Sequence, residues 1–154
     1  MYDALLSECL RLDIDVYEEN IKGSIKGLYS DNIIWINKKI KNTIEKTCIL
    51  AEELGHHFTS GGNILDQSSI VNRKQEIKAR SWAYEKLIPL SKIVQAQKEG
   101  IRNRFELAEY LGVTEEFLQS ALDRYKEKYG IYTMVDGQTL TMDPLNIWLY
   151  TERR

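Results

Sequence analysis

The spacing of apolar residues along the chain alternates between helix-like and strand-like stretches. Over residues 2–12 they recur every three to four positions, which predicts a helix, and over residues 14–17 they alternate with polar residues, which predicts a short strand. The segments SIKGLYS and IIWIN flank the polar residues 30–32, so we expect a β-hairpin there. Near the other end of the chain, IYTMV and QTLTM alternate around Asp136-Gly137, which predicts a second hairpin.

Residues that start and stop helices outline the middle of the chain. Asn42 is a suitable N-cap, and Glu45 stands three residues later, which is the capping-box spacing. We expect the helix that they start to run to about Ser60, because Gly61-Gly62 then stop it. Residues 63–72 predict a polar loop, and a helix over about 73–88 follows and ends at Pro89. A third helical stretch comes next and is interrupted by Gly100. Residues 104–130 then predict a pair of helices that is split at 112–114, with Thr114 as the N-cap of the second helix.

The composition narrows the class of protein. Of the 154 residues, 43% are hydrophobic and 29% charged, which is enough apolar material for the core of one domain without disulfides. The net charge of −2 gives no overall positive field that would attract nucleic acid or anionic lipid. We expect no signal peptide and no membrane span, because neither pattern is present. Cys9 and Cys48 lie in helical apolar stretches, so we expect reduced core residues of a cytoplasmic protein.

The segment AEELGHHF, residues 51–58, has the spacing of a metal-binding helix. Glu52 and His56 stand at positions i and i+4, which places them on one face. Glu53 follows the first of them at about 100° around the helix, where a carboxylate can hold a water at the metal and act as general base. The other register, Glu53 with His57, puts Leu54 in the place of the base, and leucine cannot accept a proton.

Two observations weigh against chance placement in a charged surface helix. The chain has two histidines and both lie in this segment. Gly55 costs about 1 kcal/mol relative to alanine inside a helix, which indicates close approach of another backbone. The next helix offers a third ligand, because Glu76 shares a face with Ala79 and Ala83, whose small side chains let that helix lie close. The alternative is a solvated glutamate beside a small-residue packing stripe.

With both helices considered, the sequence resembles the ImmA/IrrE family of zinc metallopeptidases over roughly residues 25–120. IIWIN is similar to the strand before the family's active-site helix, and LAEELGHHFTSGGNI is similar to the active-site segment of its phage-borne branch. The pattern ExxAxxxA…LIP, from Glu76 to Pro89, is similar to the segment that carries the family's third ligand. The resemblance implies His56 and Glu76 as metal ligands and Glu53 as general base.

The resemblance also implies a fold, which is a zincin-like single α+β domain over residues 1–154. We expect a small antiparallel sheet packed on the active-site helix and a helical C-terminal half. Within this domain we place a catalytic core at about 1–95, a helix-turn-helix-like pair at about 100–130, and a C-terminal hairpin at 131–150.

The sequence departs from the family pattern at two positions. Glu52 replaces the first histidine of His-Glu-x-x-His, and Arg80 stands where the family often has asparagine. Glutamate can bind zinc, so we expect Zn²⁺ held by Glu52, His56 and Glu76. Two anionic ligands make the metal a weaker Lewis acid, and an oxygen-rich donor set moves the preference towards Mn²⁺ or Fe²⁺. His57 and Arg80 are the neighbours that we expect to contact a ligand residue or the substrate.

The resemblance implies a site-specific endopeptidase that cleaves a partner protein, a helix-turn-helix repressor of a phage or mobile element. One alternative is a catalytically inactive, metallopeptidase-like binding protein, which the change at Glu52 favours. Another is DNA binding through the helix-turn-helix-like segment 106–122, but Glu115, Glu116 and Asp123 would repel phosphates. That helical pair is instead expected to pack on the core or to recognise the repressor.

Overall fold

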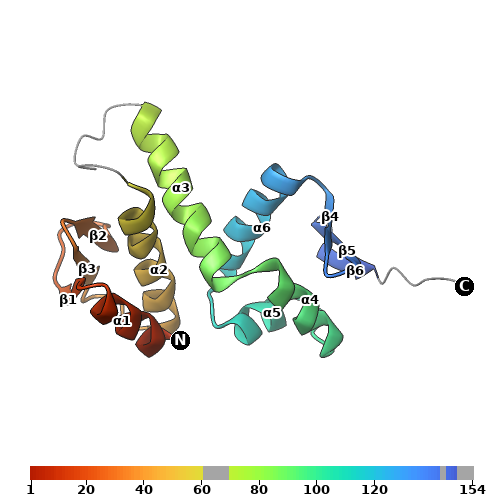
Figure 1. The fold of residues 1–154 in the computed structure, drawn as a ribbon. Coiled ribbons are helices and arrows are strands. Elements are labelled where there is room, and N and C mark those ends of the chain that lie inside the picture. The colour runs from red at the N-terminus through yellow and green to blue at the C-terminus, as the bar shows by residue number, and fades with distance from the viewer. Residues whose placement is uncertain (61–69, 143–144, 149–154) are drawn as a thin grey trace, which may run out of the picture. The chain divides into compact units, whose positions relative to one another are not determined.

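The computed structural model describes residues 1–60, 70–142 and 145–148 (Figure 1). The chain divides into two compact units, Met1–Leu87 and Ile88–Arg154. In chain order, the first unit contains α1 (Tyr2–Arg11), β1 (Asp15–Glu19), β2 (Gly27–Ser30), β3 (Ile33–Asn37), α2 (Thr43–Thr59) and α3 (Ile70–Leu87). The second contains α4 (Leu90–Lys98), α5 (Arg104–Leu111), α6 (Glu115–Tyr129), β4 (Tyr132–Val135), β5 (Gln138–Met142) and β6 (Leu145–Trp148). The expected α+β fold is confirmed, and the single-domain arrangement stays a prediction.

The sheet of the first unit is mixed, which corrects the expected antiparallel sheet. Its order is β1-β3-β2. β2 and β3 form the predicted antiparallel hairpin, with Asp31 and Asn32 at positive φ angles of 46° and 62° in a two-residue turn. β1, however, pairs parallel with β3, with Asp15 opposite Ile33. The chain between β1 and β2 carries these strands to opposite edges, and an alternating sequence pattern contains no information on strand direction.

The core of the first unit lies between this sheet and α2. Ile34 and Ile36 of the central strand are fully buried, and so is Leu54 of α2. Besides β3, α2 contacts α1, β2 and α3, so it is the element around which the unit is built. Cys9 and Cys48 are buried free thiols, as the sequence predicts. No helix within the described ranges has the length and apolar content needed to cross a membrane.

The ends of α2 and α3 test the predicted helix boundaries. The Asn42 side chain accepts hydrogen bonds of 2.8 and 3.2 Å from the backbone N–H groups two and three residues later, so the predicted N-cap is confirmed. α2 ends at Thr59, close to the predicted end, while Gly61-Gly62 and residues 63–69 of the predicted loop lie outside the described residues. α3 begins at Ile70, earlier than predicted, so the last residues assigned to the loop are helical.

The second unit consists of helices followed by an antiparallel sheet in the order β4-β5-β6. The predicted split between α5 and α6 is confirmed, because Gly112 ends α5 at a φ of 71° and the Thr114 hydroxyl accepts from the Phe117 N–H at 3.0 Å. Asp136 and Gly137, at φ angles of 50° and 79°, form the predicted turn between β4 and β5. β6 extends the predicted hairpin to a third strand.

Candidate active site

One face of α2 meets α3 at very short range. A Cβ atom added to Gly55 would lie 2.1 Å from the carbonyl oxygen of Ala79 and 3.1 Å from its Cα atom, so no larger residue fits without movement of the helices. Ala79 and Ala83 are fully buried, as expected for a small-residue packing stripe. The close backbone approach indicated by Gly55 is therefore confirmed, and it brings Glu76, one turn before Ala79, up to α2.

His56 and Glu76 meet across this contact. Nε2 of His56 lies 3.1 Å from Oε1 of Glu76, and the histidine is 7% exposed. Two ligand atoms on one tetrahedral zinc ion are about 3.3 Å apart, given bonds of about 2.0–2.1 Å. The pair therefore has a spacing that two ligands of one ion need, and without an ion it forms a hydrogen bond. The other carboxylate oxygen of Glu76 lies 3.9 Å from Nε of Arg80.

Glu53 faces a different neighbour, the edge strand β2. A Cβ atom at Gly27 would lie 3.1 Å from Oε2 of Glu53 and 2.6 Å from Cγ2 of Ile49. The Glu53 carboxyl group thus lies directly against the strand backbone, in space that exists because residue 27 has no side chain. Gly27 is a site residue that the sequence motifs do not include; a glycine inside a strand is the signal that could have indicated this close approach.

His57 lies one turn after Glu53 and faces the same strand. Its Nδ1 atom is 2.8 Å from the Tyr29 hydroxyl, and the two rings meet edge to face. Glu53 and His57 therefore point towards β2, whereas His56 points towards α3. Of the two registers considered for a ligand pair, the one that contains His56 faces Glu76.

A hollow of about 340 Å³ collects most of the predicted site residues. Its walls are β2 and the facing sides of α2 and α3, and Gly27 and Tyr29 line it from the strand. His57 does not line the hollow but holds Tyr29, which does. The predicted residues that line it are Glu52, Glu53, His56, Glu76 and Arg80.

The acidic residues of this hollow make it a poor place for negative charge without a cation. Burial raises the pKa of Glu53 to about 7, and the charges of Glu52 and Glu76 add to this rise, while those of His56 and Arg80 oppose it. Burial is also the largest cause of the raised pKa of Glu52. A carboxyl group with a pKa near neutrality can both accept and release a proton at physiological pH, as a general base must.

The pKa values of His56 and Glu76 are shifted in opposite directions, as expected for a hydrogen-bonded pair. Burial lowers the pKa of His56, but the hydrogen bond to Glu76 and the nearby carboxylates outweigh it, so the pKa lies above its usual value. The same hydrogen bond holds the pKa of Glu76 below its usual value, against the effect of burial. The Nδ1 atom of His56 is buried and has no hydrogen-bond partner among the described residues.

The donor chemistry suits a divalent metal, although the donors do not fully converge. One imidazole and two carboxylates are ligands that zinc accepts, and the His56–Glu76 pair has the required spacing. Across residues 1–60, 70–142 and 145–148, however, no three acidic, histidine or cysteine side chains stand close enough together to hold an ion. Two candidate donors thus have a suitable spacing, and Glu52, the candidate third, lines the same hollow.

A helix that carries a buried carboxyl group, covered by a small sheet and faced by a second helix with a further carboxylate, is the arrangement of a zincin-like fold. The chain matches the model of the IrrE N-terminal-like domain, which defines the M78 peptidase family, over residues 9–123. The chain belongs to this family, which is generally zinc-dependent, and the resemblance to ImmA/IrrE proteins is confirmed. Neither the curated proteins nor the solved structures contain a match to this chain.

Proposed function

We propose that the chain is a metal-dependent, site-specific endopeptidase whose substrate is a partner protein. Glu53 is the general base, and Glu52, His56 and Glu76 hold a zinc ion, with Mn²⁺ or Fe²⁺ as alternatives. The observation that carries this proposal is the placement of a carboxyl group with a pKa of about 7 in the same hollow as the 3.1 Å His56–Glu76 pair.

The chemistry assigned to the protein residues follows from their positions. When bound, the metal supplies Lewis acidity that polarises the scissile carbonyl group and activates a water molecule. Glu53 would accept a proton from the attacking water and donate it to the leaving amine. A ligand set of two glutamates and one histidine donates more negative charge to a metal than a set of two histidines and one glutamate. We therefore expect the metal to be a weaker Lewis acid here than in a site with two histidines.

β2 is suited to hold the substrate in extended form. IIWIN, the segment that is similar to the strand before the family's active-site helix, is β3, and it pairs on both sides. β2 is the edge strand that lines the hollow, and within the described residues its outer edge pairs with no other strand. A peptide that adds to this edge would form backbone hydrogen bonds next to Glu53. Gly27 lies against the Glu53 carboxyl group, so the bound peptide would pass closest to the base where it pairs with the backbone at Gly27.

The proposed partner is a helix-turn-helix repressor of a phage or mobile element, and the proposed location is the cytoplasm. The support for both is the family membership and the resemblance to its phage-borne branch. α5 and α6 are proposed to recognise the repressor. Direct DNA binding is disfavoured because Glu115, Glu116 and Asp123 of α6 are exposed and acidic.

The second candidate function is a metallopeptidase-like binding protein without activity. Two observations favour it, namely the replacement of the first motif histidine by Glu52 and the incomplete convergence of three donors in the described part of the chain. Co-expression with the candidate repressor, followed by mass spectrometry of the fragments, distinguishes the two. Wild type should cleave at one position, Glu53→Gln should bind without cleavage, and Glu19→Gln, an exposed change on β1, should cleave like wild type. Binding without cleavage by the metal-loaded wild type would establish the inactive protein instead.

A further inference from the structure

The second unit has a larger hollow that the proposed peptidase reaction does not use. Its volume is about 390 Å³, and residues of α4, α5, α6, β5 and the segment between α4 and α5 line it. Its floor is apolar, because Ile93, Leu107, Leu122 and Met142 are all buried. The volume falls within the range of about 300–1,000 Å³ that is typical of small-molecule sites.

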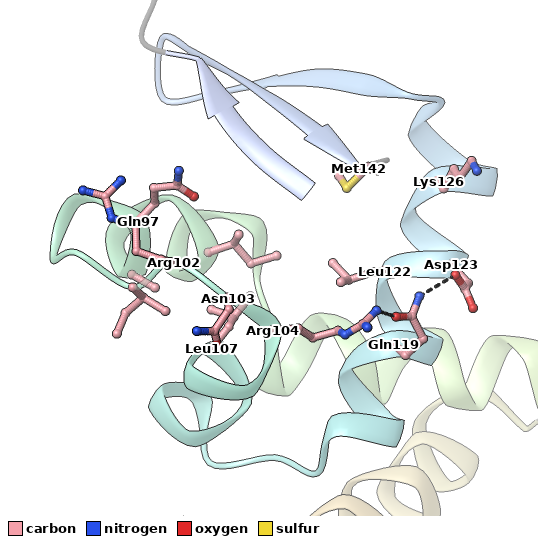
Figure 2. A pocket seen from close by; sticks show the side chains of 13 residues that line it. Gln97, Arg102, Asn103, Arg104, Leu107, Gln119, Leu122, Asp123, Lys126 and Met142 are labelled. Carbon is pink, nitrogen blue, oxygen red and sulfur yellow. Dashed lines mark hydrogen bonds between the residues drawn. The ribbon is translucent and has the colours of Figure 1, made fainter. Parts of the chain in front are cut away.

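The rim of this hollow carries more positive than negative charge. Arg102, Arg104 and Lys126 line it, with Asp123 as the single acidic lining residue. This local surplus stands in a chain whose net charge is −2, so it is not a consequence of overall composition. Figure 2 shows Arg102 and Arg104 on opposite sides of the hollow.

The Arg104 side chain is oriented by a chain of hydrogen bonds. A guanidinium nitrogen of Arg104 donates to the side-chain oxygen of Gln119, and the amide of Gln119 donates to Asp123 at 2.9 Å (Figure 2). Arg104 thus bonds to the neutral amide of Gln119 and not directly to the Asp123 carboxylate. Neither Arg104 nor Arg102 forms an ion pair with any residue in the described part of the chain.

We propose that this hollow binds a small organic anion, a carboxylate attached to an apolar ring or branched alkyl body. The buried floor would accept the apolar body, and an arginine of the rim would accept the carboxylate, since a guanidinium group matches a carboxylate with two parallel hydrogen bonds. A metal ion does not suit the hollow, because it offers one carboxylate among three cations. A neutral apolar ligand would make no use of the positive charge at the rim.

This binding is independent of the proposed peptidase, because every lining residue belongs to the second unit. The test uses the full chain, titrated calorimetrically with 2-naphthoate and with its neutral analogue 2-naphthamide. We expect one saturable site for 2-naphthoate and binding of the amide that is weaker by about tenfold or more, since the ionic hydrogen bonds are lost. Amide chemical-shift changes should concentrate on α4, α5, α6 and β5.

Variants of the rim give the second arm of the test. The Arg102→Gln and Arg104→Gln double variant should weaken 2-naphthoate by about tenfold and leave 2-naphthamide unchanged, while Lys98→Gln, an exposed cation that does not line the hollow, should change neither. Equal binding of acid and amide by the wild type would overturn the proposal even if the double variant failed to fold. So would the absence of saturable binding, or binding only of an acidic peptide, which would make the hollow a protein-docking site.

Discussion

Gly55 of α2 packs so closely on Ala79 of α3 that a Cβ atom at position 55 would lie 2.1 Å from the Ala79 carbonyl oxygen. The contact sets the separation of the two helices at the level where His56 and Glu76 approach to 3.1 Å. The glycine is therefore linked to the candidate metal site through helix packing, although its own atoms lie outside the reacting groups.

Gly55→Ala should lower the free energy of unfolding by about 1–3 kcal/mol, the usual cost of overpacking a core. The gain of about 1 kcal/mol in helix propensity offsets only part of the clash, because the opposing atom is backbone and cannot rotate away. Urea denaturation measures the change. Ser120→Ala is the control, because it raises helix propensity at an exposed position of α6 where the added preference meets no clash. A Gly55→Ala protein as stable as wild type would mean that the helices separate at no cost.

The two neighbouring histidines offer a matched test of the ligand register. His56→Ala should reduce bound metal from about one ion per chain to near zero after a zinc soak, because Nε2 of His56 is the atom that faces Glu76. His57→Ala should keep the metal, because the His57 ring contacts Tyr29 of β2 and does not line the hollow. Elemental analysis of both variants is the measurement. Loss of metal from His57→Ala alone would reverse the assigned register.

Glu52→His should raise the affinity for zinc by at least about tenfold while the fold is retained. The change replaces a carboxylate whose pKa is raised by burial with a neutral nitrogen ligand that zinc binds well. Competition against a chelator, with circular dichroism to check the fold, measures the effect. Unchanged or weaker affinity would show that residue 52 is not a ligand, and Glu53→His would then be the next variant to examine.

Much of this site could be predicted because its signals are local. The i, i+4 spacing of Glu52 and His56, the N-cap at Asn42 and the glycine at position 55 each depend on a few consecutive residues and on helix geometry. The pairing of Glu76 with His56 rested on the small residues of its helix face, which predict closeness to another helix but do not identify it.

The features that the sequence did not predict depend on residues far apart in the chain. Whether β1 runs parallel to β3 is decided by the path of the connecting segment and not by the strand pattern. The contact of Glu53 with Gly27 joins residues from two different elements, and no spacing rule connects them. The hollow of the second unit is formed by several elements, so its lining has no sequence signature of its own.

Gly27→Ala should lower the rate of substrate cleavage by about ten- to a hundredfold while metal content stays at the wild-type level. The added methyl group would stand 3.1 Å from the Glu53 carboxyl oxygen and 2.6 Å from Ile49, so it would displace the base, and small errors in position have effects of this size. The measurement is initial cleavage rate together with bound metal. Ser30→Ala, at the end of the same strand, is the control. A normal rate for Gly27→Ala would show that the position of Glu53 against β2 does not matter.

In metal-free protein, the stability difference between wild type and Glu53→Gln should depend on pH. The pKa of Glu53 is raised from its ordinary 4.5 to about 7 in the folded state. Folding therefore favours the protonated form. The contribution of this group to the free energy of unfolding is fully present below pH 4.5 and is lost as pH rises through 7. At pH 8 the ionised carboxylate costs wild type about 3 kcal/mol relative to low pH, because one pKa unit corresponds to about 1.4 kcal/mol. Glutamine does not ionise, so this cost is absent from the variant.

Urea denaturation in the presence of a chelator, at pH 5, 6, 7 and 8, measures both proteins. The stability of Glu53→Gln relative to wild type should increase from pH 5 to about pH 7 and level off by pH 8, in addition to any constant difference that the amide itself introduces. Glu52 and His56 also titrate from raised pKa values and are present in both proteins, so the difference reports the ionisation of Glu53 together with its charge coupling to these two groups. Glu19→Gln, an exposed change on β1, is the control for the loss of a carboxyl group outside the hollow. A difference for Glu53→Gln that does not change with pH would show that its carboxyl group is already ionised at pH 5, and would remove the physical basis for its role as a base that exchanges protons near neutrality.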